Sequence, residues 1–210
     1  MKNPMLIDHP LVACHLTTLR DKRTNSTEFR QAVSRMTTFL AFAATEDIRT
    51  ADQPIETPIQ KTTGKRLTDR VGIIPILRAG VAMVDPLLNV IPTAEVWHLG
   101  LYRDETTAQP VRYYNKLPVY DPVDLAFILD PMLATGGSAC EACRALLNWG
   151  VKRIKMLSII SAPEGIARLS KTYPDIDIFT CAIDRGLNEH KFIVPGLGDA
   201  GDRIFNTTGQ

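Results

Sequence analysis

The chain has 210 residues, 45% of them hydrophobic, and carries a formal net charge of +1. This length allows one substantial hydrophobic core, and a charge so near neutral gives no strong attraction to nucleic acid or to an anionic membrane. Four scattered cysteines are too few for a disulfide framework, and Cys140-x-x-Cys143 lacks the second half of a zinc site. No apolar run approaches the roughly 18 residues of a membrane span, so we expect a soluble cytoplasmic protein.

The first part of the chain is predicted to contain one long helix. Residues 5–24 are predicted to be irregular, with a short helix after Pro10 as the alternative, and the basic residues Arg20, Lys22 and Arg23 favour a solvated face over a contact to substrate phosphate. The long helix begins at Asn25, with Glu28 as its capping-box partner. Its apolar positions recur at helical spacing and predict one buried face, made of Phe29, Val33, Met36, Leu40 and Ala44.

Strands and helices then alternate from residue 71 to 183. Before them, the prolines within 50–64 predict an extended element outside the main sheet. Strands are predicted at 71–77, 95–101, 125–130, 151–162 and 176–183. One helix ends at Gly150, and the next opens with the capping-box spacing of Ser161 and Glu164. This order predicts an α/β fold, an open parallel sheet with flanking helices.

The stretch from 125 to 140 has the pattern of an anion site. A strand ends at Asp130, and Thr135-Gly136-Gly137-Ser138 opens a helix. Two glycines let backbone N–H groups face a ligand, and the helix N-terminus carries roughly +0.5 charge. The expected ligand is a phosphate monoester, and the alternative is a tight strand-to-helix turn with no ligand.

Two arginines follow other strands. Arg78 and Arg103 fall at carboxyl ends, where open parallel sheets bind ligands, and guanidinium groups suit phosphate or pyrophosphate. An alternative partner of Arg78 is Asp85. The long connection 106–122 predicts either a lid or a two-stranded flap.

The glycine-rich tail 186–203 exposes backbone donors and acceptors at close range. Such a loop can read a flat heterocycle, and the alternative is a flexible C-terminal loop. Its apolar side chains favour an anchored loop.

Five ordered motifs together resemble the uracil phosphoribosyltransferase family, a branch of the type I phosphoribosyltransferases. They are Ile-Leu-Arg-Ala-Gly (76–80), Gly-Leu-Tyr-Arg-Asp-Glu (100–105), Asp-Pro-Met-Leu-Ala-Thr-Gly-Gly-Ser (130–138), Ala-Pro-Glu-Gly-Ile (162–166) and Ile-Val-Pro-Gly-Leu-Gly-Asp-Ala-Gly-Asp-Arg (193–203). Many type I members have two adjacent acids where this chain has Asp130-Pro131. The resemblance therefore implies no metal ligand from the protein, with Mg²⁺ held mainly by the substrate's pyrophosphate.

The resemblance implies transfer of a phosphoribosyl group from phosphoribosyl pyrophosphate to uracil, in a single domain with a core at about 65–185. A hood made by the N-terminal segment and residues 186–210 would cover the base. Catalysis is expected from Arg78, Arg103, Asp130 and Asp199. Binding of phosphoribosyl pyrophosphate is expected from these four residues together with Pro131, Met132, Leu133, Ala134, Thr135, Gly136, Gly137 and Ser138. Uracil would be read by the backbone of Ile193, Gly198, Asp199 and Ala200. His190 and Asp199 are the candidates for the base that deprotonates uracil.

Two other functions fit parts of the pattern. One is a pyrimidine regulator of the same fold that binds nucleic acid, for which a basic stripe would be expected. The other is a transferase for a different base. The family also implies a homodimer or a larger homo-oligomer, and the sequence leaves open whether guanosine triphosphate activates the protein.

Overall fold

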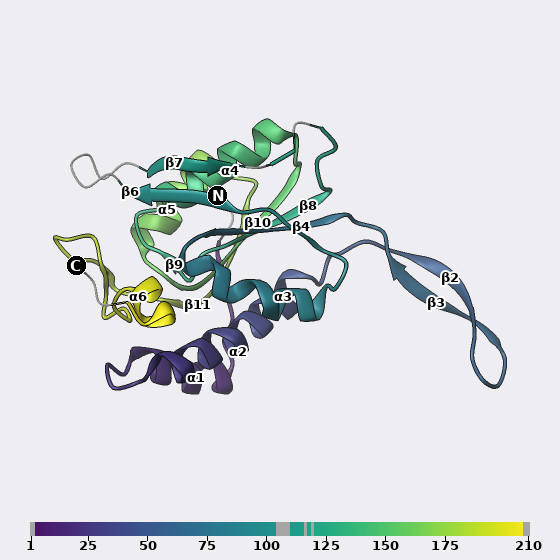
Figure 1. Ribbon diagram of the computed structural model, residues 1–210, viewed down its shortest axis with the longest axis horizontal. Helices are drawn as coiled ribbons and strands as arrows, with labels where there is room; N and C mark the ends of the chain where they lie inside the picture. Colours follow the sequence, from purple (N-terminus) through teal and green to yellow (C-terminus); the bar gives the residue numbers. More distant parts are fainter. Residues whose placement is uncertain (1–2, 104–109, 116, 119, 208–210) are drawn as a thin grey trace.

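The computed structural model describes residues 3–103, 110–115, 117, 118 and 120–207, with the backbone alone for 101–103, 110–113 and 115. Its main sheet has the order β1-β11-β10-β8-β4-β6-β7 (Figure 1). The strands are β1 Met5–Leu6, β4 Val71–Leu77, β6 Leu99–Arg103, β7 Pro110–Asn115, β8 Leu125–Leu129, β10 Arg153–Ser161 and β11 Asp177–Ile183, with β5 Glu95–Val96 beside β4 and β9 Met132–Leu133 beside β10. All of these pairs are parallel except β6 with β7. The predicted open parallel sheet is confirmed.

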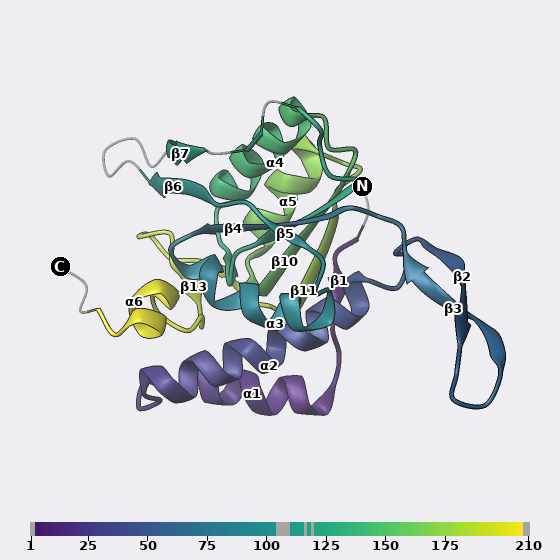
Figure 2. The ribbon, with the colours of Figure 1, turned by 45° about the vertical axis from the view of Figure 1, so that its right-hand side comes forward.

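Helices cover both faces of this sheet, as Figure 2 shows. One face carries α1 Pro10–Arg20, α2 Ser26–Ala44 and α3 Val84–Val90, and the other carries α4 Gly137–Trp149 and α5 Pro163–Thr172. Strand residues alternate between the two layers. Phe127 and Leu129 join the core cluster under α2, whereas Ile128 joins the cluster under α4.

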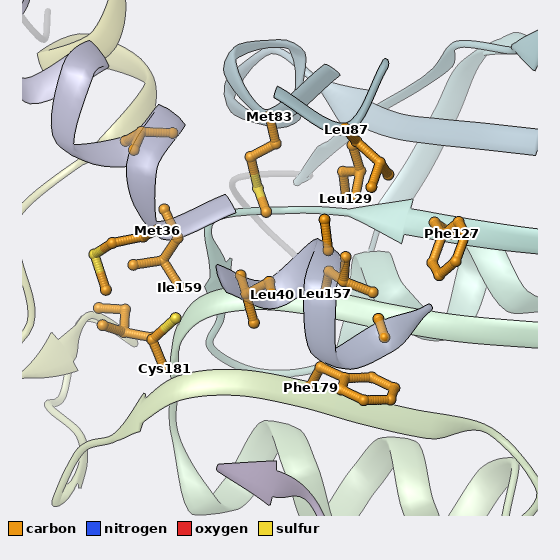
Figure 3. Packing of buried hydrophobic residues seen from close by; sticks show 14 of the residues in the cluster. Met36, Leu40, Met83, Leu87, Phe127, Leu129, Leu157, Ile159, Phe179 and Cys181 are labelled. Atoms are coloured by element: carbon orange, nitrogen blue, oxygen red, sulfur yellow. The ribbon is translucent and has the colours of Figure 1, made fainter. Parts of the chain in front are cut away.

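The long helix α2 forms as predicted. Asn25 is its N-cap, and the Asn25 side chain accepts a hydrogen bond from the backbone N–H of Glu28 at 3.0 Å. All five residues of the predicted apolar stripe are fully buried. Figure 3 shows Met36 and Leu40 against the side chains of β10 and β11. The packing of α2 on β10 and β11 holds the sheet in place, and the candidate site described below lies at the carboxyl edge of this sheet.

The extended element outside the main sheet is also observed. β2 Thr50–Glu56 and β3 Lys61–Leu67 pair antiparallel and project from the body as an arm (Figure 1). At the other side of the molecule, the strand pair β6 and β7 forms the two-stranded flap that was one alternative for 106–122. Residues 104–109, which join the two strands in sequence, lie outside the described residues, as do 116 and 119.

The segment 5–24, predicted to be irregular, contains α1, the helix that was the alternative after Pro10. Two other local predictions were wrong. The strand predicted at 95–101 is divided into β5 and β6, which both pair with β4. Pro75 lies opposite the break and has no N–H to donate, so the ladder is interrupted there. The predicted capping box of Ser161 and Glu164 does not form: the N-cap of α5 is Ala162, and the Ser161 hydroxyl donates to Thr180 Oγ1 at 2.9 Å inside the protein.

The remaining short elements gather at the carboxyl edge of the sheet. They are the 3-10 helix η1 Ala79–Met83, the strand pair β12 Gly186–Leu187 and β13 Ile193–Val194, and α6 Ala200–Phe205. In Figures 1 and 2, α6 lies on the side toward which β6 points. Helix α6 is therefore near the strand ends that were predicted to bind ligand.

Candidate functional site

Asp130 lies directly after β8, at the carboxyl edge of the sheet. Its Oδ1 accepts a hydrogen bond from the backbone N–H of Met132 at 3.2 Å. Burial raises the pKa of the Asp130 carboxyl to about 7, and the negative charge of Asp199 adds to the rise, while the Met132 N–H opposes it. Asp130 is thus an acid that can accept or donate a hydrogen bond near neutral pH, and Asp199 is close enough to act on its charge.

The predicted glycine turn is present between β9 and α4. Gly136 has a φ of +73°, in the left-handed region that favours glycine, and α4 begins at Gly137. The N-cap of this 13-residue helix is Gly136, which has no side chain to cap the first N–H groups. A cavity of about 80 Å³ opens there, lined by Asp130, Met132, Leu133, Ala134, Thr135, Gly136, Gly137, Ser138 and Ala139. It has room for several water-sized groups, since one water needs about 10–15 Å³.

The first turn of α5 supports this glycine turn from behind. A Cβ on Gly165 would lie 2.5 Å from the carbonyl oxygen of Ala134 and 2.7 Å from that of Leu133. A Cβ on Gly136 would in turn lie 2.8 Å from the carbonyl oxygen of Gly165. Only glycine fits at either contact, so the position of the turn depends on α5. Gly165 is part of the motif 162–166, but no local pattern indicated this role for it.

Arg78 follows β4, the neighbour of β8 in the sheet. Gly80 packs so closely on β8 that a Cβ there would lie 2.3 Å from the carbonyl oxygen of Leu129. The ion partner of Arg78 is Asp202, with Nη2 3.1 Å from Oδ1, and not the expected alternative Asp85. The Arg78 side chain is 58% exposed, so it can reach a ligand at this edge.

Arg103 is the last residue of β6, the other neighbour of β4. The ends of β8, β4 and β6 therefore carry an acid and two arginines on adjacent strands. The side chain of Arg103 lies outside the described part of the chain, so its direction stays a prediction.

The C-terminal loop meets the strand ends. Ile193 in β13 is buried, and Gly196 and Gly198 have positive φ values of 65° and 79°. Asp199 is the N-cap of α6, and its Oδ1 accepts from the backbone N–H of Asp202 at 2.9 Å. A Cβ on Gly201 would lie 3.2 Å from Asp199 Oδ1 and 3.6 Å from Arg78 Nη2. Asp199 and Arg78 thus flank the same glycine.

Two residues that hold this loop were missed by the sequence analysis. Asp184, directly after β11, is buried and accepts two hydrogen bonds from Arg20. The signal for Asp184 was available, since an acid directly after a strand is the feature that singled out Asp130. Arg20 was assigned to a solvated face, whereas its neighbour Arg23 does lie at the surface, paired with Asp21.

The described residues contain no group of three or more His, Cys, Asp and Glu that could hold a metal ion. Among the described helices, none has both the length and the apolar character to cross a membrane.

The fold and the site define a class of protein: an α/β protein with an open parallel sheet, whose carboxyl edge brings together an acid, a glycine turn and a C-terminal loop. A family model described as uracil phosphoribosyltransferase matches residues 6–207. The chain belongs to the uracil phosphoribosyltransferase family, and the resemblance drawn from the five motifs is confirmed.

Relatives of this chain match it over almost its whole length. A uracil phosphoribosyltransferase of Roseiflexus sp. (strain RS-1) is 53% identical and one of Anoxybacillus flavithermus is 50% identical, each over 99% of this chain and 100% of the relative. The solved structure of the AQ2163 protein from Aquifex aeolicus has a TM-score of 0.93 and 32% identity, covering 99% of this chain and all of that one. A hypoxanthine phosphoribosyltransferase from Trypanosoma cruzi, at 9% identity, a TM-score of 0.50 and 75% coverage of each chain, shares the fold.

Proposed function

We propose that this chain transfers the 5-phosphoribosyl group of phosphoribosyl pyrophosphate to N1 of uracil, giving uridine monophosphate and pyrophosphate. Membership of the family over residues 6–207 supports this reaction. The observation that carries the proposal is the glycine turn at the start of α4, which opens on a cavity beside Asp130. A helix N-terminus of this kind suits a phosphate monoester, and the ribose of the same molecule would then lie next to an acid.

Each part of the two substrates would meet one group of residues. Residues Thr135–Ser138 would hold the 5′-phosphate, with the backbone of 131–134 around it. Asp130 would accept hydrogen bonds from the ribose hydroxyls. Arg78 and Arg103 would bind the pyrophosphate group, and Asp199 would lie near the phosphoribosyl pyrophosphate molecule. The backbone of Ile193, Gly198, Asp199 and Ala200 would read uracil.

The pair of Arg78 with Asp202 is compatible with this role. Exposed ion pairs contribute only about 0–1 kcal/mol, and the Arg78 side chain is more than half exposed. A pyrophosphate carries more negative charge than one carboxylate and offers oxygens that suit the guanidinium fork. The ligand would therefore displace Asp202 at little cost.

In the reaction, the bond from ribose C1′ to the pyrophosphate oxygen breaks and the bond from C1′ to uracil N1 forms. Positive charge builds on the ribose and negative charge on the leaving group, which Arg78 and Arg103 would stabilise as charges already in place. The N1 proton must leave uracil. Asp199 is the better placed candidate to accept this proton, because it lies beside Arg78 at the sheet edge. The side chain of the other candidate, His190, is 74% exposed, and its Nε2 lies 3.4 Å from Glu189 Oε1.

Magnesium is the cofactor that we propose for this reaction. Mg²⁺ usually keeps several waters and is bound by one or two carboxylates together with substrate phosphates. The pyrophosphate would supply most of the ligands of the ion. The carboxylates of Asp130 and Asp199 would lie beside the ion, and the negative charge of Asp199 raises the pKa of Asp130. When bound, the ion neutralises charge on the leaving group. A homo-oligomeric state and a cytoplasmic location stay predictions.

The test is a spectrophotometric assay with uracil, phosphoribosyl pyrophosphate and Mg²⁺. We expect turnover by the unaltered chain and a loss of about 10²-fold or more in Arg103→Ala, as for removal of a charge contact in the transition state. Arg35→Ala is the control, because Arg35 is exposed on α2, away from the sheet edge. Equal rates for the wild type and Arg103→Ala would refute the role of Arg103, and turnover of hypoxanthine without turnover of uracil would refute the reaction.

A further inference from the structure

A buried ion pair lies behind the loop that we propose reads the base. It joins Arg20, the last residue of α1, to Asp184, which directly follows β11. Arg20 Nη2 lies 2.5 Å from Asp184 Oδ1, and Arg20 Nη1 lies 2.9 Å from Asp184 Oδ2. The Asp184 side chain is 4% exposed and that of Arg20 is 26% exposed. A two-point contact of this kind fixes orientation as well as distance.

Asp184 is held in its charged form by these contacts. Burial alone would raise the pKa of the Asp184 carboxyl, but the hydrogen bonds from Arg20 and from the backbone N–H of Gly196 outweigh burial and lower it. Without Arg20, the carboxylate would be buried with its charge uncompensated, which is strongly unfavourable.

The same pair forms hydrogen bonds with both backbone polar groups of Gly196. The Gly196 N–H donates to Asp184 Oδ2 at 2.9 Å, and the Gly196 carbonyl oxygen accepts from Arg20 Nη1 at 2.9 Å. Gly196 lies between Ile193 and Gly198 in a turn so tight that a Cβ on Gly196 would be 2.1 Å from the carbonyl oxygen of Ile193. Movement of Gly196 would therefore move the backbone on both sides of it.

A second arginine ties the other side of this loop to the same end of α1. Arg203 in α6 donates to the carbonyl oxygen of Leu197 at 2.9 Å, to that of Asp21 at 2.6 Å, and to that of Leu19. Its guanidinium also lies over the ring of Phe29, 4.4 Å from the centroid. The loop is thus anchored to the end of α1 at Gly196 through Arg20 and at Leu197 through Arg203.

We propose that Arg20 and Asp184 are positioning residues for the base subsite: they hold the backbone of 193–198 in the conformation that reads uracil. The inference rests on the proposed function, because it assumes that this loop meets the base. Backbone N–H and C=O groups cannot be redirected by a change of rotamer, so their aim is set by whatever fixes the main chain. Here the bidentate pair binds the middle of the turn and would act on the base only through the main chain.

The chemistry of the pair predicts how variants behave. Arg20→Gln leaves Asp184 buried without a cation and removes the bond to the Gly196 carbonyl. Arg20→Lys restores the charge but not the planar fork, so it cannot bind both carboxylate oxygens and the carbonyl in the same way. Arg23→Gln is a matched control, because the Arg23 side chain is 84% exposed and pairs only with nearby Asp21 among the described residues.

The experiment measures both substrates separately in the full-length protein. We expect kcat/KM for uracil to fall about tenfold or more in Arg20→Gln, where tenfold corresponds to about 1.4 kcal/mol. The KM for phosphoribosyl pyrophosphate should stay within about twofold, because the glycine turn is untouched. Arg20→Lys should recover part of the loss, and Arg23→Gln should behave as the wild type.

Hydrogen exchange gives a second readout that needs no turnover. Amides of 193–200 should exchange faster in Arg20→Gln than in Arg23→Gln, while those of 137–149 in α4 should be unchanged. Wild-type kinetics and wild-type exchange in Arg20→Gln would overturn the proposal, and so would equal losses for both substrates. If the wild type itself does not turn over uracil, the proposed function fails, and the exchange data still decide whether the pair holds the loop.

Discussion

The contact between α5 and the glycine turn gives a sharp prediction for Gly165→Ala. The added Cβ would lie 2.5 Å from the Ala134 carbonyl oxygen, whereas ordinary contact begins at 3.4 Å. The turn or the helix must therefore shift by about 0.9 Å. A misplacement of about 1 Å can cost roughly 10²-fold in rate, so kcat/KM for phosphoribosyl pyrophosphate should fall by about that factor.

Stability should respond much less than activity. Overpacking costs about 1–3 kcal/mol, but alanine is about 1 kcal/mol better than glycine inside a helix. The two effects partly cancel, so the free energy of unfolding should fall by at most about 2 kcal/mol. Urea unfolding and steady-state kinetics on the same preparation separate the two effects.

Gly64→Ala is the matched control for this experiment. Gly64 lies in β3 of the arm, and a Cβ there would approach the end of the flexible Ile55 side chain at 3.3 Å. Its kinetics should match those of the wild type. If Gly165→Ala retains kcat/KM within about twofold of the wild type, the turn does not depend on α5 for its position and the argument is wrong.

Two further substitutions test other parts of the structure. The pKa of Asp130 is raised to about 7, so below that pH its carboxyl must lose a proton before the carboxylate can accept hydrogen bonds from the ribose hydroxyls. The affinity for phosphoribosyl pyrophosphate should therefore fall as pH drops through 7. A titration series at several pH values should show that Asp130→Asn removes this dependence. Because this pKa is raised on folding, its favourable contribution to stability is fully present below the unfolded pKa of about 4 and is lost as pH rises to 7, so Asp130→Asn should raise Tm more at pH 8 than at pH 5. Asn25→Ala removes the N-cap of α2 and should lower the free energy of unfolding by about 1 kcal/mol with unchanged kinetics, which urea unfolding would check; no loss of stability would argue against the cap.

Features encoded in short runs of residues could be predicted from the sequence. The apolar run 125–129 and the acid after it indicated a strand that ends at the sheet edge, and β8 ends at Leu129. Gly136 needs a left-handed conformation that glycine favours, and two adjacent glycines signalled it. The stripe on α2 was evident because its period matches a helix turn.

Features that depend on distant partners could not be predicted. Arg20 and Asp184 are 164 residues apart, and nothing local distinguishes Arg20 from the exposed Arg23. The partner of Arg78 is Asp202, 124 residues away, whereas the sequence offered only the nearby Asp85. Ser161 has the spacing of a helix cap, but its hydroxyl is buried beside Thr180, which is known only once β10 and β11 are paired.

The central claim is that the glycine turn at the start of α4 holds the 5′-phosphate of the donor. Titration calorimetry with ribose 5-phosphate and with unphosphorylated ribose tests it, using the wild type and Gly136→Ala, whose new Cβ would lie 2.8 Å from the Gly165 carbonyl oxygen. We predict saturable binding of ribose 5-phosphate to the wild type, weakened about tenfold or more in Gly136→Ala, and far weaker binding of ribose to both. Equal affinities for the two sugars, or an unchanged affinity in Gly136→Ala, would contradict the account.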